Sequence, residues 1–230
     1  MKKLLLFTIA GFLFANGFAQ RLAKLTFADN GNLEVISFEL PEAVIINVSK
    51  DGSIVKWGVN RYAGREVQIY EDKLDEYTGR VEYFRSTDNE AFRGKIKYIG
   101  MTALTYYASY DIESLRGKLR SIGTTIIDYY QNFDDAAFKG NVKKIGNFEF
   151  AWNSSFDNEA LKGKLRSVGA TNIDYFPSFA EKAFAGKIKS IAGNNFTYFS
   201  QFDSKEYPRG KIKTGAQIQY HNGIKFFIRN

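Results

Sequence analysis

The side chains that most often carry enzymatic chemistry are scarce in this chain. It contains a single histidine, His221, and no cysteine. A Ser-His-Asp or Cys-His arrangement is therefore hard to assemble, and so is a transition-metal site, which normally needs several imidazole or thiolate ligands. His221 directly precedes the Asn222-Gly223 pair, which is typical of a two-residue hairpin turn, so we interpret it as a solvated turn residue. We expect no cofactor, no metal site and no catalytic residue.

Carboxylates could still support catalysis, because a glycosidase needs only two acids about 5 to 10 Å apart. Asp128 and Asp174 occupy equivalent positions two repeats apart, and Glu149 lies between them with an offset of two residues. Side chains that recur in this way fit a scaffold, in which they pair with neighbouring lysines on a solvated face. We predict that the chain is not an enzyme and retain a carboxylate-dependent glycan hydrolase as an alternative.

Aromatic residues are the strongest indication of a binding surface. Two adjacent columns of aromatic residues recur with a spacing of 23 residues, and neighbours along a strand point to opposite faces of a sheet. The first column (Tyr83, Tyr106, Tyr129, Trp152 and Tyr175) accompanies large aliphatic residues and is predicted to be core. The second accompanies mixed residues and is predicted to be partly exposed. With the lysines that follow the repeat glycines, it forms a predicted binding face for a glycan or an envelope protein: Phe84, Tyr107, Tyr130, Phe176, Lys118, Lys164 and Lys187.

A tandem repeat must position these residues. Stretches such as GKIKYIG and GKLRSIG begin at glycines 23 residues apart, and one more follows after 24: Gly94, Gly117, Gly140, Gly163, Gly186 and Gly210. Each unit contains a short strand, a glycine turn, a strand with alternating hydrophobic residues, and a connector such as NFDDAAFKG. The connector is predicted to form a single helical turn that begins at Asp134 or Asp157 and packs Phe138 or Leu161 against the sheet.

This pattern predicts an all-β fold in which tandem strand-turn-strand units form an extended antiparallel meander, with short helical turns between the units. A β-solenoid of stacked coils is the alternative. In a solenoid, equivalent lysines would lie about 4.8 Å apart and repel one another. A meander inserts a strand bearing Asp128 or Asp174 between the lysine-bearing strands, which favours the meander.

Less regular segments flank the repeats. We predict an irregular β cap at residues 20–78, the tandem repeats at 79–215, and a hairpin cap at 216–230 that turns at Asn222-Gly223. Atypical ends are expected because an open stack of repeats must cover its last sheet edges.

The first 19 residues have the pattern of a secretory signal peptide. Lys2 and Lys3 precede an apolar run that is too short to span a bilayer, and small residues lead to a cleavage site between Ala19 and Gln20. We expect export to the periplasm, the cell surface or the medium, with no transmembrane segment after cleavage. Export also argues against a nucleic-acid partner. The formal charge of +7, or +5 without Lys2 and Lys3, decides little about the partner.

The phrase GKLRSIG-x-x-x-IDYY-x-x-FD at residues 117–134 recurs at 163–180, with Phe176 for the second tyrosine and Ala180 for the aspartate. It resembles the YD-type repeats of secreted bacterial proteins, and the similarity covers residues 79–220. The resemblance implies an extended extracytoplasmic β structure without chemistry of its own. YD units usually close on Asp-x-x-Gly, whereas four to six residues separate the aspartate and the glycine here. We expect an exported scaffold or binding module of the cell envelope, with a purely structural envelope protein as a further alternative.

Overall fold

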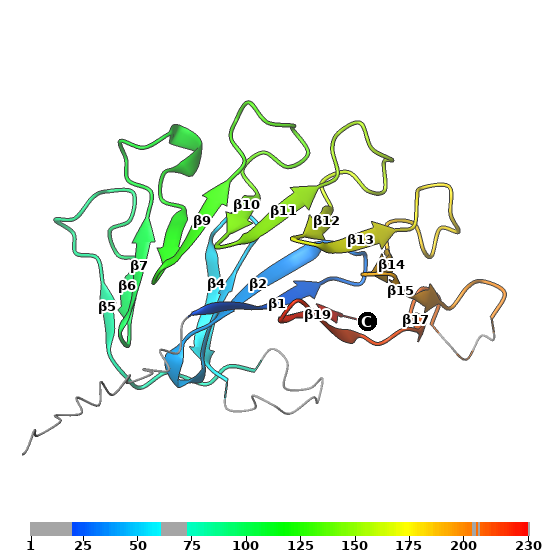
Figure 1. Cartoon of the computed structure of the whole chain (residues 1–230), viewed down its shortest axis with the longest axis horizontal. Coiled ribbons are helices and arrows are strands. Elements are labelled where there is room, and N and C mark those ends of the chain that lie inside the picture. The colour runs from blue at the N-terminus through cyan, green and yellow to red at the C-terminus, as the bar shows by residue number, and fades with distance from the viewer. Residues whose placement is uncertain (1–19, 61–72, 204–205, 207, 230) are drawn as a thin grey trace, which may run out of the picture.

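The repeats form the predicted antiparallel meander. The computed structural model describes residues 20–60, 73–203, 206 and 208–229, so the predicted signal peptide lies outside the described residues. Eleven strands are hydrogen-bonded in chain order from β5 to β15, and each unit pairs as a hairpin rather than as a solenoid coil (Figure 1). The strands are β5 Val81–Tyr83, β6 Ile96–Ile99, β7 Thr102–Tyr106, β8 Leu119–Ile122, β9 Thr125–Tyr129, β10 Val142–Ile145, β11 Phe148–Trp152, β12 Leu165–Val168, β13 Thr171–Tyr175, β14 Ile188–Ile191 and β15 Asn194–Asn195.

The segments on either side of the repeats form one second sheet. Its strand order is β18-β19-β1-β2-β3-β4, and the parallel pair β1 and β19 joins the beginning of the described chain to its end. The two segments predicted as separate caps are thus neighbours in space. The strands are β1 Arg21–Phe27, β2 Leu33–Glu39, β3 Val44–Val48, β4 Ile54–Val59, β18 Ile218–His221 and β19 Ile224–Ile228, with a 3-10 turn, η1 Pro41–Ala43, before β3. A small two-stranded sheet contains β16 Thr197–Tyr198 and β17 Ile212–Thr214.

The hydrophobic core lies between the two large sheets. The eleven-stranded sheet curves over the six-stranded one (Figure 1), and buried residues of both form a single cluster. Phe38 and Ile46 contribute from the smaller sheet, and Ile127 and Phe150 contribute from the repeats. This arrangement explains the alternation along each second strand, because only one face of the repeat sheet meets the smaller sheet.

The first aromatic column lies in this core, as predicted, except at the sheet edge. Tyr129 is buried and its hydroxyl donates to the Leu119 carbonyl at 2.6 Å, while Trp152 makes the equivalent bond from Nε1 to Val142 at 2.8 Å. The polar end of a buried ring needs such a partner, which explains why tyrosine or tryptophan occupies the position. Tyr83, in edge strand β5, is 54% exposed.

The connectors contain the predicted single helical turn. The Lys139 amide donates to the Asp135 carbonyl four residues earlier at 2.8 Å, and Gly140 ends the turn with a φ of +79°. Phe138 packs against Tyr130 with 4.6 Å between ring centroids. The side chain that caps the turn is Asp135, which accepts from the Ala137 amide, rather than the predicted Asp134. One connector also contains a 3-10 turn, η3 Glu113–Leu115.

Candidate binding surface

The aromatic residues of the predicted binding face are built into the scaffold. Phe84, Tyr107, Tyr130 and Phe176 are all half-buried and pack against the core cluster. The Tyr107 hydroxyl donates to the Ile127 carbonyl at 3.2 Å, and the Arg120 guanidinium lies 5.5 Å from its ring centroid. Burial raises the pKa of the Tyr107 hydroxyl, and the charge of Asp128 adds to the rise. These contacts leave little of each ring available to a ligand.

The lysines of the predicted face point into the molecule. Lys164 and Lys187 are each only 8% exposed. Lys164 Nζ donates to the Asn30 carbonyl at 2.6 Å, and Lys187 Nζ forms an ion pair with Asp29 at 2.6 Å, so both hold the turn between β1 and β2 beneath the repeat sheet. Lys118 is half-buried and donates to the Gly140 carbonyl of the next unit at 2.6 Å. Lys164 and Lys187 of the predicted binding face are therefore engaged within the fold instead of lying exposed on an outer surface.

The buried ammonium of Lys164 should make stability depend on pH. Burial lowers its pKa to about 8, with a further contribution from the charge of Lys187. The pKa in an unfolded chain is about 10.4, so the unfolded state binds more protons between these values and stability rises with pH. We expect Lys164 to add about 2 kcal/mol to the free energy of unfolding between pH 7 and pH 9.5. Urea denaturation at several pH values measures this change.

The matched control for that measurement is Lys164→Met, which keeps most of the length of the side chain and removes the titrating group. Its unfolding free energy should rise less steeply over the same pH interval. Equal pH slopes for the two proteins would show that Lys164 does not lose its proton on folding.

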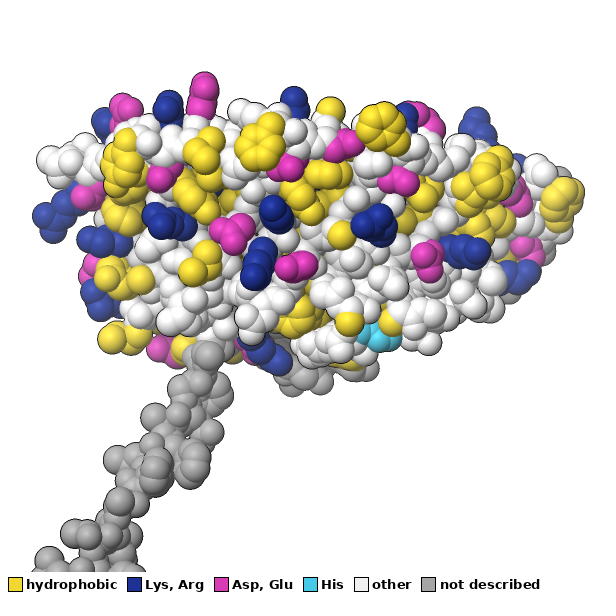
Figure 2. All heavy atoms as spheres, turned by 45° about the horizontal axis from the view of Figure 1, so that its top comes forward, with side chains coloured by type: hydrophobic (Ala, Val, Ile, Leu, Met, Phe, Trp, Pro, Cys, Tyr) yellow, Lys and Arg dark blue, Asp and Glu magenta, His cyan; other side chains and the backbone are white. Residues whose placement is uncertain are grey.

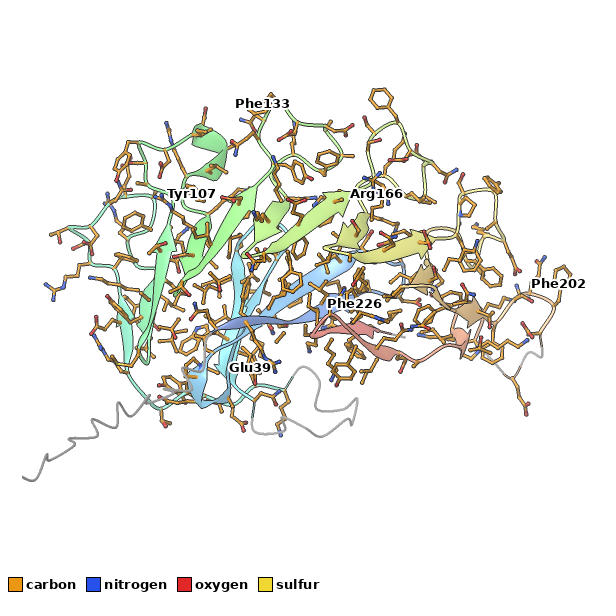
Figure 3. The ribbon with its side chains drawn as sticks, in the orientation of Figure 1. Glu39, Tyr107, Phe133, Arg166, Phe202 and Phe226 are labelled. Atoms are coloured by element: carbon orange, nitrogen blue, oxygen red, sulfur yellow. The ribbon has the colours of Figure 1, made fainter. Side chains whose placement is uncertain are left out.

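A different set of aromatic residues is exposed at the connectors. One such residue stands in each of five successive connectors, at a spacing of 23 residues, and each is between 85% and 95% exposed. In Figure 3, Phe133 and Phe202 lie at the ends of their connectors, away from the ribbon. Hydrophobic side chains recur along the same side of the molecule in Figure 2. We call this set the aromatic ridge: Tyr110, Phe133, Phe156, Phe179 and Phe202.

Hydrogen bonds on both sides of the ridge residues fix the loops that carry them. After Phe156, Asp157 accepts from the Ser154 amide at 2.5 Å and folds the loop back on itself. The equivalent bonds follow Tyr110, Phe133 and Phe202. The hydrogen bonds from Ser154 hold the pKa of Asp157 below its usual value.

A second set of hydrogen bonds joins each loop to the next. Asp135 Oδ1 accepts from the Ser155 amide of the following loop at 3.0 Å, and Asp135 Oδ2 accepts from the Ser155 hydroxyl at 2.8 Å. In the same way, the Asn158 side chain accepts from the Ser178 amide at 2.8 Å. The Glu181 side chain accepts from the Gln201 amide at 2.7 Å. Because donor and acceptor lie 20 residues apart, these bonds set the position of one ridge residue relative to its neighbour. The ridge is therefore preorganised.

The acids considered for catalysis have structural partners. Asp128 lies opposite Lys144 in the β9–β10 ladder, and Asp174 accepts from the Ser190 hydroxyl at 2.6 Å. A hollow of about 650 Å³ at edge strand β5 contains Glu82 and Asp88, and these carboxylates accept hydrogen bonds from Arg80 and from the Arg85 amide, respectively. No group of three or more His, Cys, Asp or Glu residues suited to a metal ion occurs in the described part of the chain. These contacts supply no specific support for catalysis.

The lone histidine also has a structural environment. His221 lies at the end of β18, where its Nε2 is 3.0 Å from Gln219 Oε1 and its ring packs edge-on against Phe226. It is half-buried rather than fully solvated.

The aromatic ridge was not predicted from the amino-acid sequence, although its signal is present there. An aromatic residue directly precedes an aspartate at Tyr110-Asp111, Phe133-Asp134, Phe156-Asp157 and Phe202-Asp203. The 23-residue spacing marks these residues as part of the repeat but does not distinguish an exposed ring from a buried one. That distinction depends on how the loop folds around the aspartate.

One structural observation and three comparisons with known proteins bear on identity. Among the residues for which the structure is described, no helix is sufficiently long and apolar to cross a membrane. Comparison of the chain with protein-family models, with curated proteins and with solved structures finds no match. The likeness to YD-type repeats therefore depends on the repeated motif alone, and the molecule is identified by its fold as an all-β protein with a long antiparallel meander of hairpin strands.

Proposed function

We propose that this protein is an exported, non-catalytic binding module of the cell envelope that holds an extended ligand along its aromatic ridge. The observation that carries the proposal is the exposure of five aromatic rings at equivalent positions of successive repeats. Exposed apolar side chains that recur in a row along one side of a molecule are a candidate interaction site. The ridge rings are almost fully exposed, so burial in the core does not explain them.

The rest of the fold supports such a surface mechanically. The repeat sheet is braced by the six-stranded sheet. Of the residues predicted to bind, Lys164 and Lys187 fasten the β1–β2 turn to the repeats, and the Tyr107 hydroxyl joins one repeat unit to the next. Hydrogen bonds between loops then hold the ridge in one arrangement. A surface that is ordered before the ligand arrives loses less conformational entropy on binding.

The cellular location in this proposal comes from the amino-terminal sequence. The basic start, the short apolar run and the small residues before Gln20 are typical of an exported protein. The absence of cysteine means that the fold depends on its hydrophobic core rather than on disulfides.

The test is retention of the protein on insoluble envelope material and on a panel of immobilised glycans. We expect the triple variant Phe133→Ala/Phe156→Ala/Phe179→Ala to lose at least about tenfold in affinity, because several linked contacts are removed together. Urea denaturation should show little change in stability, since the three rings are exposed.

Met101→Ala provides the matched control. Met101 is as exposed as the ridge residues but lies in a hairpin turn at the opposite end of the strands. Its removal should leave retention unchanged. If the triple variant is retained as well as the wild type, the ridge is not the binding surface. If the wild type is retained by no material, a purely structural role replaces the binding role.

A further inference from the structure

The loops that carry the ridge differ in charge from the chain as a whole. The connector stretches 108–116, 131–139, 154–162, 177–185 and 200–208 contain nine carboxylates and five basic residues, a net charge of −4 (five minus nine), whereas the whole chain carries +7. An acidic surface repels polyanions, phosphorylated ligands and anionic lipid headgroups. The net positive charge of the whole chain therefore does not indicate an anionic ligand at the ridge.

The spacing of the ridge also restricts the ligand. Each unit contributes two strands, so equivalent points of neighbouring units lie roughly 9.5 Å apart within the sheet. The connectors spread apart where they leave the sheet (Figure 1), and the polar contacts of Ser155 with Asp135 and of Ser178 with Asn158 lie between neighbouring loops. A protein partner would meet a contiguous apolar patch at the centre of its interface, with a polar rim around it. A series of isolated, equivalent rings matches a polymer whose own units repeat.

From these two observations we infer that the ligand of the ridge is an electrically neutral polysaccharide chain lying across successive connectors. This inference rests on the proposed function. A pyranose ring presents C–H groups on one face, which pack against an aromatic ring, and hydroxyl groups around its edge. The hydroxyls are donors for carboxylates and serine side chains between the ridge rings, and such bonds need no charge on the ligand. Four of the five ridge residues are phenylalanine, whose rings can contribute stacking contacts but no hydrogen bonds.

The experiment is affinity electrophoresis through gels that contain soluble hydroxyethylcellulose or glucomannan as neutral probes, or polygalacturonate as an anionic probe. Phosphatidylglycerol vesicles, tested by co-flotation, represent an anionic membrane. We expect a neutral probe to retard the wild type, with little effect of salt because no charges pair. Phe156→Ala should weaken binding about fivefold and the triple ridge variant roughly a hundredfold, because contacts from linked rings multiply. Met101→Ala should match the wild type.

The outcomes separate the inference from the proposed function. The neutral polysaccharide is overturned if the wild type binds polygalacturonate or the vesicles, loses that binding at high salt, and binds neither neutral probe. In that case the ridge is still the binding surface if the triple variant loses the binding to the anionic probe. Retardation of the triple variant by a neutral probe to the same extent as the wild type overturns the ridge itself. Absence of wild-type binding to every probe overturns the polysaccharide inference.

Discussion

Replacing Phe150 with alanine is expected to lower the free energy of unfolding by about 3–5 kcal/mol. Phe150 is 0% exposed, and its strand β11 lies in the interior of the eleven-stranded sheet, between β10 and β12. Its ring belongs to the core shared with the six-stranded sheet. Two hydrogen-bonded layers cannot easily collapse around the cavity that alanine would leave, so the loss should lie toward the upper end of this range. Urea denaturation measures it.

Phe156→Ala is the matched control for this prediction. It is the same substitution in the same repeat, six residues further on, at a ring that is almost fully exposed. Its unfolding free energy should stay within about 0.5 kcal/mol of the wild type. Similar losses for the two variants would contradict the face-to-face packing of the sheets. A stable Phe156→Ala protein also shows that a loss of binding by this variant reflects the missing ring rather than unfolding.

Replacing Gly31 with alanine should destabilise the fold strongly, because the turn that contains it is packed against the repeat sheet. Gly31 lies in the turn between β1 and β2 with a φ of +82°, and an added Cβ would lie 2.5 Å from the Gly186 carbonyl oxygen and 3.1 Å from the Tyr175 ring. The left-handed backbone costs an alanine about 1–2 kcal/mol, and the overlap adds about 1–3 kcal/mol. We expect a total loss of about 2–5 kcal/mol in unfolding free energy by urea denaturation.

Gly193→Ala isolates the backbone part of this effect. Gly193 has a φ of +81°, but in the described part of the chain no atom outside its two chain neighbours would lie within 4 Å of an added Cβ. Gly193→Ala should lower the free energy of unfolding only by the cost of the left-handed backbone conformation, about 1–2 kcal/mol. Equal losses at Gly31 and Gly193 would mean that the β1–β2 turn does not press against the repeat sheet.

These predictions separate the scaffold of each repeat from its outward surface. The buried rings of Tyr129 and Phe150 hold the layers together, and Lys164 and Lys187 fasten the turn beneath them. The rings of the aromatic ridge contribute little to this packing. One repeat can therefore change the ring at its connector without a large loss of stability, and the proposed ligand contacts can vary from unit to unit.

The antiparallel meander was predictable from local pattern. Alternation such as Ile127, Asp128 and Tyr129 places hydrophobic side chains on one face of a strand, and the glycines at 23-residue spacing mark where the chain turns. Both signals act over a few residues, so they are visible without knowledge of the rest of the fold. The core position of the first aromatic column follows from the same alternation.

The roles of the individual polar and aromatic side chains depended on contacts between distant segments. Lys164 was predicted to face a ligand, but the turn at Asn30 lies 134 residues away in the chain and covers it. Tyr107 was predicted to be available, but the Ile127 carbonyl of the next unit engages its hydroxyl. Repetition identifies equivalent positions in the sequence, but it does not reveal which residue each side chain will contact in the fold.

The amino-acid sequence by itself determined the strand-turn-strand unit, its direction of pairing and the hydrophobic face of each second strand, because side-chain alternation and glycine conformation are local properties. The tertiary structure alone decided that residues 20–60 and 218–228 form one sheet beneath the repeats, through the parallel pairing of β1 with β19. It also decided which rings remain outside. A ring in a strand is buried where the sheet formed by the two ends of the described chain packs against its face. A ridge ring stays exposed because of the way its connector folds.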